Sequence, residues 1–159
     1  MKCIILLLVL VCCAAGIEIA GDITNTTRIL LTGGWDESSS VFPSSPGCPP
    51  PSLPSQRDGH VTFTTDSGLV ATCGGEDESH THLSTCLVLE DGRWQPDPRV
   101  PDLPQPRYQA TSVSVPRVGV FIMGGRGRLT SSLLLTDGSW KEGPTLPGAG
   151  VLNGACAVA

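Results

Sequence analysis

The chain has 159 residues and a net charge of −5 at pH 7. Its few Lys and Arg residues form no basic stripe, which argues against nucleic-acid binding. It also contains no phosphate-binding loop, no Gly-x-Gly-x-x-Gly motif and no nucleophile elbow, so nothing marks a nucleotide-binding protein or a serine hydrolase.

The N-terminus has the layout of a secretory signal peptide. Lys2 supplies a positive charge, an apolar run follows from Ile4 to Val11, and the small residues 14–16 close the segment. We therefore expect residues 1–16 to be cleaved and residues 17–159 to be secreted into the extracellular space. An uncleaved membrane anchor is the alternative, but the apolar run is short for a bilayer span.

The first expected β unit lies at about 29–47. An apolar run at Ile29–Thr32 leads into Gly33-Gly34, and the sequence indicates no strand before it. Asn25 begins an Asn-Thr-Thr acceptor for N-glycosylation, a tripeptide that is common by chance but plausible behind a secretory leader. This unit is therefore expected to begin at its second strand, with a sugar on Asn25.

The second and third units, at about 60–95 and 109–141, have the same order of parts. Apolar runs alternate with turn signals, and each unit ends with an Asp-Gly dipeptide that predicts a tight hairpin. The expected strands are 60–65, 69–73, 84–90 and 93–95 in the second unit, and 109–115, 119–123, 129–136 and 139–141 in the third. Residues 153–159 are expected to start a further unit.

A Gly-Gly pair recurs at corresponding places, as Gly33-Gly34, Gly74-Gly75 and Gly124-Gly125, at intervals of 41 and 50 residues. The second and third pairs are followed by Trp94 and Trp140, each just after an Asp-Gly turn. Periods of this length are typical of proteins built from stacked structural repeats. The sequence therefore indicates an all-β chain of repeated units.

This order of parts resembles the kelch repeat, and Gly74-Gly75 with Trp94 and Gly124-Gly125 with Trp140 carry the resemblance. The first unit lacks the Trp, and all three lack the Tyr that often follows the glycines. The resemblance implies a kelch-type β-propeller of about three four-stranded blades, with both Trp rings packed between blades. Closed propellers have about four to eight blades, so residues 17–159 imply an incomplete ring. A piece of a larger propeller, a splice form or truncated gene product, and an arc completed by self-association all remain open.

Four cysteines follow the leader: Cys48, Cys73, Cys86 and Cys156. Cys73 and Cys86 fall on expected neighbouring antiparallel strands, so we predict a disulfide between them in an oxidising compartment. The partners of Cys48 and Cys156 stay open, and buried free thiols are the alternative. No Cys-x-x-Cys spacing suggests zinc.

The loop between the second and third strands of the second unit is rich in carboxylates and imidazoles, contributed by Glu76, Asp77, Glu78, His80 and His82. These groups could bind a divalent cation, but we expect an exposed, solvated loop without metal. The matching loop of the third unit is basic, with Arg126 and Arg128. In propellers of this type such loops share a face with the connectors between blades, and that face commonly binds partners. A mixed-charge rim would suit a polar protein or a glycan.

The sequence thus predicts a secreted, non-catalytic binding or scaffolding module without a cofactor. The alternative is the N-terminal fragment of a copper oxidase related to galactose oxidase, whose metal site needs Tyr and His ligands from several blades. Only one tyrosine is present, Tyr108, at a position expected to be structural. Intracellular kelch adaptors of ubiquitin ligases fit poorly, because they carry a dimerisation domain where this chain has its leader. We expect the chain alone to associate, because both ends of an open arc expose apolar surface.

Overall fold

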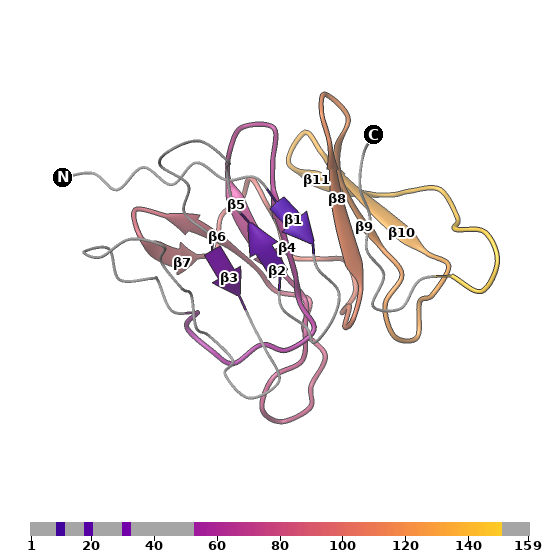
Figure 1. Ribbon diagram of the computed structural model, residues 1–159, viewed down its shortest axis with the longest axis horizontal. Coiled ribbons are helices and arrows are strands. Elements are labelled where there is room, and N and C mark those ends of the chain that lie inside the picture. The colour runs from indigo at the N-terminus through magenta and orange to yellow at the C-terminus, as the bar shows by residue number, and fades with distance from the viewer. Residues whose placement is uncertain (1–8, 12–17, 21–29, 33–52, 151–159) are drawn as a thin grey trace.

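The computed structural model describes residues 9–11, 18–20, 30–32 and 53–150 (Figure 1). Within these ranges the protein is all-β and contains no helix. No helix there is long and apolar enough to cross a membrane. The strands are β1 (Val9–Val11), β2 (Glu18–Ala20), β3 (Leu30–Thr32), β4 (Val61–Thr64), β5 (Val70–Cys73), β6 (Cys86–Glu90), β7 (Arg93–Gln95), β8 (Thr111–Val115), β9 (Gly119–Met123), β10 (Ser132–Thr136) and β11 (Ser139–Glu142).

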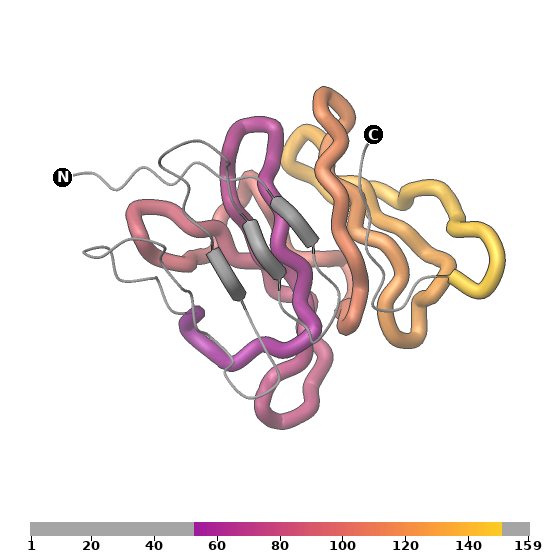
Figure 2. The backbone as a smooth tube through the Cα atoms, in the orientation of Figure 1, coloured from indigo at the N-terminus to yellow at the C-terminus, as the bar shows by residue number. Residues whose placement is uncertain are grey.

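Two four-stranded antiparallel sheets form the main body. The first sheet has the order β4-β5-β6-β7 and the second has the order β8-β9-β10-β11 when followed along the chain. Each strand therefore pairs with the next one in sequence, and the two sheets lie next to each other (Figure 2). All eight strands expected in the second and third units are present, with ends that differ by at most three residues.

The last hairpin of each sheet turns at an Asp-Gly dipeptide, as predicted. Asp91 and Gly92 have φ of 49° and 75°, and Asp137 and Gly138 have φ of 52° and 68°. Two consecutive residues with positive φ make the turn whose twist matches antiparallel strands, and Asp-Gly tolerates it well. Local turn chemistry thus sets the register of both hairpins.

One cluster of buried side chains joins the two sheets. Phe63, Ala71 and Val88 of the first sheet and Ile122 and Leu135 of the second belong to it, and each is at most 5% exposed. Strands β4 and β8 also lie side by side, because the Ser112 hydroxyl donates to the Thr62 carbonyl at 3.1 Å. The sheets therefore pack face to face, with their first strands adjacent.

The two tryptophans occupy corresponding positions in the last strands of the sheets. The Trp140 ring meets Phe63 edge-on, with centroids 6.2 Å apart, and its Nε1 donates to the Pro101 carbonyl at 2.7 Å. Trp94 is buried on the opposite face of the first sheet, in a second cluster that includes Leu53. Trp140 thus packs between the first and second sheets. The sequence analysis predicted a position between two repeated units for both tryptophan rings.

The predicted cysteine pair is in place. Cys73 and Cys86 lie directly opposite each other on β5 and β6, and their Sγ atoms are 2.02 Å apart, at disulfide distance. Both residues are 1% exposed and belong to the cluster between the sheets. The two sulfur atoms are thus placed for a disulfide bond, as predicted, whereas Cys48 and Cys156 lie outside the described residues.

A third sheet, with the order β1-β2-β3, adjoins β4 through β2 (Figure 1). Its β2 pairs with β3, which corrects the expectation that no strand precedes the apolar run at Ile29–Thr32. A three-residue strand without a flanking turn signal leaves little trace in a sequence. Strand β1 lies within the segment 1–16 interpreted as a leader and pairs with β2.

Candidate functional site

The loops of both sheets and the connector between the sheets meet at one end of the molecule. The backbone amide of Gly75 donates to the Arg107 carbonyl at 2.8 Å, and the Arg107 amide donates to the Leu83 carbonyl at 3.2 Å. The amide of Arg126 donates to the Tyr108 carbonyl at 2.8 Å. We call this end the loop face, and it comprises residues 76–83, 107–109 and 126–128.

The Gly-Gly pair of the first sheet lets the connector approach closely. Gly74 has φ of 71°, and a Cβ atom placed on it would lie 2.4 Å from the carbonyl oxygen of Arg107. Gly75 has φ of 95°, and a Cβ there would lie 2.7 Å from the Asp58 carbonyl oxygen. Positive φ and close backbone contact both exclude a side chain. These glycines therefore position the connector over the end of β5.

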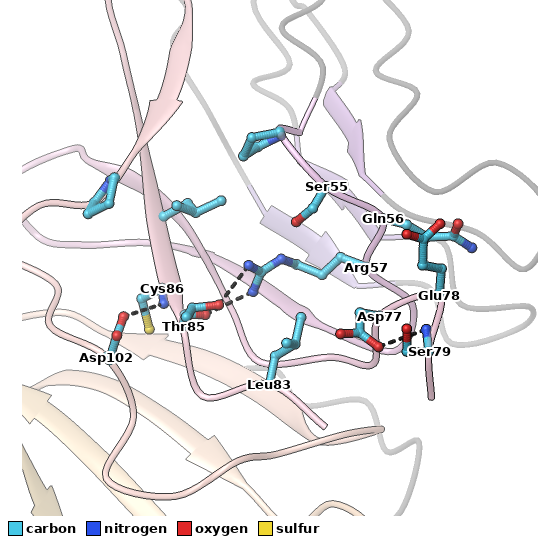
Figure 3. A pocket seen from close by; sticks show the side chains of 13 residues that line it. Ser55, Gln56, Arg57, Asp77, Glu78, Ser79, Leu83, Thr85, Cys86 and Asp102 are labelled. Atoms are coloured by element: carbon cyan, nitrogen blue, oxygen red, sulfur yellow. Dashed lines mark hydrogen bonds between the residues drawn. The ribbon is translucent and has the colours of Figure 1, made fainter. Parts of the chain in front are cut away.

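Two buried arginines, Arg57 and Arg107, hold the loop bases, and the sequence analysis did not predict their burial. Arg57 donates to the carbonyl of Gly74 at 2.9 Å. It also donates to the carbonyl and hydroxyl of Thr85, at 2.9 and 2.8 Å (Figure 3). Arg107 makes the corresponding bonds to the Gly124 carbonyl and to the carbonyl and hydroxyl of Ser131. Arg57 follows Leu53-Pro54 and Arg107 follows Leu103-Pro104 at the same spacing, which indicates corresponding positions in the two units but does not indicate burial.

Burial lowers the pKa of both guanidinium groups. For Arg107 the pKa falls to about 10, chiefly through desolvation and secondarily through the nearby charge of Arg128. Desolvation also lowers the pKa of Arg57, and the nearby carboxylate of Asp102 partly opposes it. Both groups remain cationic at pH 7, so each brings a positive charge beneath the loop face.

Within the predicted acidic loop, Glu76 holds two imidazoles. Its Oε1 lies 2.7 Å from His80 Nδ1, and its Oε2 lies 3.2 Å from His82 Nε2. The hydrogen bond to Glu76 raises the pKa of His80 above its ordinary value. The His80 side chain is 87% exposed, but that of Glu76 is only 14% exposed. Full exposure of the whole set was therefore a wrong expectation, because Glu76 turns inward to bridge its neighbours.

The remaining acidic residues of this loop play different parts. Asp77 is half-buried, and its Oδ1 accepts hydrogen bonds at 2.9 Å from the amides of Ser79 and Thr81. Glu78 is exposed, as expected. The described residues contain no group of three or more His, Cys, Asp or Glu side chains arranged to hold a metal ion. Asp77 therefore shapes the loop, while Glu78 is available to a partner.

Tyr108 joins the acidic loop to the basic loop. Its ring is stacked with His82, with centroids 5.2 Å apart, and its hydroxyl donates to Asp58 Oδ2 at 3.3 Å. Burial and the neighbouring carboxylates raise the pKa of this hydroxyl. Because the Tyr108 carbonyl accepts from Arg126, the two loops meet at one residue. The side chains of Arg126 and Arg128 are exposed beside this junction.

A hollow of about 690 Å³ opens below the acidic loop (Figure 3). Arg57 lies at its wall, and Asp77, Glu78 and Asp102 contribute carboxylates. A hollow lined by Arg107, Ser131 and Trp140, with a volume of about 250 Å³, lies beside the second sheet. Leu83, Leu87 and the prolines at 54 and 96 also line the larger hollow, so its wall is part charged and part apolar.

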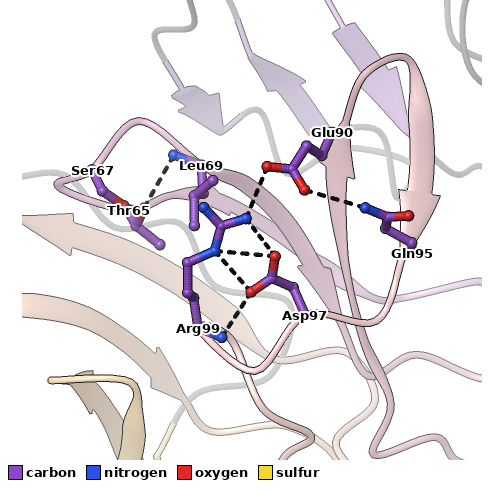
Figure 4. A network of polar contacts seen from close by, with 7 residues as sticks. All are labelled: Thr65, Ser67, Leu69, Glu90, Gln95, Asp97 and Arg99. Carbon is purple, nitrogen blue, oxygen red and sulfur yellow. Dashed lines mark hydrogen bonds and ion pairs between the residues drawn. The ribbon is translucent and has the colours of Figure 1, made fainter.

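The opposite end of the first sheet has charges that are paired with one another. Arg99 donates through Nε to both carboxylate oxygens of Asp97, at 2.9 and 3.1 Å, and through Nη2 to Glu90 at 3.0 Å (Figure 4). These hydrogen bonds lower the pKa of Asp97 to about 2. The loop face, with unlike charges on neighbouring loops, is therefore the better candidate site.

Several predicted residues lie outside the described ranges: Asn25, Gly33, Gly34, Cys48, Cys156 and the segment 153–159. The disulfide-distance pair Cys73 and Cys86 is consistent with an extracellular protein. No protein-family model matches this chain, and comparison with curated proteins finds no match.

Proposed function

We propose that this protein is a secreted, non-catalytic binding module of the kelch β-propeller type, and that its loop face binds a polar protein or a glycan. The packing of the two sheets supports the architecture. Successive four-stranded meanders lie face to face, with their first strands β4 and β8 adjacent, as in neighbouring blades. The corresponding bonds of Arg57 and Arg107 are further support for two units of one kind.

The observation that carries the binding proposal is the meeting of two oppositely charged loops at Tyr108. Glu78 and His80 on one loop and Arg126 and Arg128 on the other are exposed. The bases of both loops are hydrogen-bonded to the backbone of the connector at Arg107 and Tyr108. A rigid rim of mixed charge selects partners by complementary charge and by hydrogen bonding. Polar proteins and glycans present such groups, whereas nucleic acid would need a more basic surface.

The proposal can be tested with the chain produced through a secretory pathway and labelled with a fluorophore. We expect it to bind members of a glycan array or of a panel of extracellular protein domains. A loop-face variant with Glu78→Ser, Arg126→Ser and Arg128→Ser should lose this binding. A control variant at the opposite end, with Arg117→Gln and Asp137→Asn, should retain it.

Two outcomes would overturn the proposal. Binding that persists in the loop-face variant would place the site elsewhere, and an absence of binding on both arrays would remove its basis. Copper bound tightly to the purified product, together with oxidase activity on a sugar alcohol group, would favour the oxidase alternative instead.

A further inference from the structure

The two hollows beside the loop face occupy the same place in the two four-stranded units. Three positions of the wall correspond: a proline of the connector, the buried arginine, and a leucine of the third strand. These residues are Pro54, Arg57 and Leu87 in the first unit and Pro104, Arg107 and Leu133 in the second. The hollow therefore belongs to the plan of the unit, and the residues that differ between the two hollows set what each of them can bind.

The first hollow is larger and more acidic than the second. Its volume is about 690 Å³, and its wall has the three carboxylates of Asp77, Glu78 and Asp102 against one guanidinium, that of Arg57 (Figure 3). The second hollow, of about 250 Å³, has two cations, Arg107 and Lys141, and one carboxylate, that of Glu142. A positively charged group is thus favoured in the first hollow and disfavoured in the second.

Asp102 is one of the residues that make this difference. The next residue along its connector, Leu103, donates its amide to the carbonyl two positions before the third strand, at 2.8 Å. Leu146 makes the corresponding bond in the second unit at 2.7 Å, so Thr145 occupies the place of Asp102. The second hollow therefore has a hydroxyl where the first has a carboxylate.

Each of the three carboxylates keeps an oxygen available to a ligand. Asp102 accepts from the Cys86 amide at 2.8 Å through Oδ1, which leaves its Oδ2 unengaged. Asp77 likewise uses only Oδ1, for the two amides of its own loop. Glu78 is exposed and makes no hydrogen bond or ion pair within the described part of the chain. In contrast, the carboxylates at the opposite end of this sheet are paired with Arg99.

The rest of the wall suits a long side chain with an aliphatic stem. Leu83, Leu87 and the prolines at 54 and 96 contribute apolar surface beside the carboxylates. Lysine and arginine side chains bury their methylene groups against apolar surface and keep the charged end at polar groups. The buried Nε–H of Arg57 has no hydrogen-bond partner among residues 53–150, so the wall also holds a donor for an oxygen atom such as a peptide carbonyl.

We propose that the hollow of the first unit binds a lysine or arginine side chain presented by an extended, basic segment of a partner protein. The stem lies against the leucines and prolines, and the cationic group lies among Asp77, Glu78 and Asp102. This inference rests on the proposed function, because the acidic loop belongs to the loop face, and it names the chemistry of the partner. A neutral glycan gains nothing from three carboxylates, so the hollow favours a basic protein segment.

The test is a titration of the purified, ¹⁵N-labelled full chain with an acetylated and amidated pentapeptide, Gly-Ser-Lys-Ser-Gly, followed by NMR. We expect the peptide to shift amide signals of residues 55–57, 77–79 and 102. The same peptide with acetyl-lysine at its centre keeps the stem and loses the charge, and it should bind about tenfold more weakly. Raising the salt concentration should weaken the lysine peptide and leave the acetyl-lysine peptide unchanged.

Two variants of the protein locate the site. Asp102→Asn removes one charge but keeps an oxygen that can accept from the Cys86 amide, and it should weaken the lysine peptide about threefold. Glu78→Gln should act in the same direction and guards against a local effect of the first variant on folding. The matched control is Glu142→Gln, which removes one carboxylate from the second hollow and should leave binding unchanged.

Three outcomes would overturn the proposal: no shift with the lysine peptide, equal binding of the acetyl-lysine peptide, or unchanged binding in both acidic variants. A stronger shift of the same signals by N-acetylglucosamine would assign the hollow to a glycan and would overturn it as well. The proposed function is tested separately, because Arg126 and Arg128 line neither hollow. An array partner that is lost with Arg126→Ser and Arg128→Ser but kept with Asp102→Asn would support binding at the loop face and reject the hollow.

Discussion

The two four-stranded sheets share a backbone plan but differ in the side chains placed on it. Each sheet has a buried arginine, Arg57 in the first and Arg107 in the second. In both sheets it donates to the carbonyl of the first glycine of the Gly-Gly pair and to the carbonyl of the residue just before the third strand. Where the first sheet pairs Cys73 with Cys86, the second places Met123 opposite Ser132. The comparison separates what the fold needs, which is common to both sheets, from what each sheet adds.

The two sheets also differ near their first strands and in their loops. The first sheet buries His60, whereas position 110 in the second is an alanine. The loop of the first sheet is acidic and that of the second is basic. The residues that both sheets share lie in the packing and in the turns. The residues that differ can set three separate properties: the cysteine pair sets redox sensitivity, His60 sets the pH response, and the two loops set the choice of ligand.

The largest expected effect comes from a shared feature, the glycine against which the connector packs. Gly74→Ala should lower the free energy of unfolding by roughly 3–4 kcal/mol, because a left-handed residue would carry a Cβ against a backbone carbonyl. The matched control is Gly68→Ala, with φ of 80° and no atom within 4 Å of the added Cβ.

Urea denaturation followed by tryptophan fluorescence would measure both glycine variants. The control should lose only about 1 kcal/mol, the cost of the left-handed backbone alone. Equal losses in the two variants would show that the close approach of Arg107 to Gly74 is not important for stability.

The second prediction concerns the disulfide, which only the first sheet has. Replacing Cys73 and Cys86 with Ala should lower the free energy of unfolding by about 3 kcal/mol, since the bond closes a short loop in the unfolded chain. Reducing agent should destabilise the parent protein and leave the double variant unchanged. Peptide mapping that finds both thiols free in the purified parent would contradict the prediction.

The third prediction uses His60, whose pKa burial lowers from 6.5 to about 4. Between about pH 6.5 and pH 4, His60 is therefore protonated in the unfolded chain but neutral in the folded protein. The free energy of unfolding falls as the pH drops through this range. Between pH 7.5 and 5 we expect a loss of about 2 kcal/mol from this residue. The stability that depends on neutral His60 is fully present above pH 6.5.

The variant His60→Ala places at position 60 the alanine that the second sheet has at the corresponding position 110. It therefore isolates the pH dependence that comes from His60. It should be less stable than the parent at pH 7.5, because it loses packing and the contact of Nδ1 with the Arg57 carbonyl. Its stability should nevertheless decline less steeply between pH 7.5 and 5. Parallel pH profiles for parent and variant would show that His60 is protonated equally in the folded and unfolded states.

Local signals made much of the fold predictable. Alternating apolar residues and the Asp-Gly turns at positions 91 and 137 indicate strands and hairpins over short stretches of chain, and the spacing of Cys73 and Cys86 follows from two adjacent strands. The site was predictable only as a set of loops. The stacking of His82 with Tyr108 and the bond from Tyr108 to Asp58 depend on how the two sheets pack.

The burial of the two arginines could not be predicted from the sequence either. Arg57 and Arg107 follow proline-rich segments that read as exposed connectors, and their acceptors lie 17 residues or more away in sequence. Which connector crosses which loop is decided by tertiary packing. The inward turn of Glu76 has a more local origin, because its partners His80 and His82 lie in the same loop and are brought to its carboxylate by the path of that loop.

The smallest effect should come from the exposed positions at which the two loops differ. A triple variant with Glu78→Ser, His80→Asn and Arg128→Ser should melt within about 2 °C of the parent, since exposed side chains away from packing contribute little. Asn is chosen at position 80 because His80 has φ of 58°, which Asn tolerates better than most residues. Glu76 is left in place and still holds His82, so the loop keeps its contact with Tyr108.

Thermal melting with and without added zinc or calcium completes this comparison of the two loops. If the loops differ only in what they offer to a partner, neither ion should shift the melting temperature of the parent or of the triple variant. A large drop in the variant, together with stabilisation of the parent by either ion, would show that the acidic loop organises around a metal. That outcome would make the acidic loop of the first sheet part of its framework, with no counterpart in the basic loop of the second.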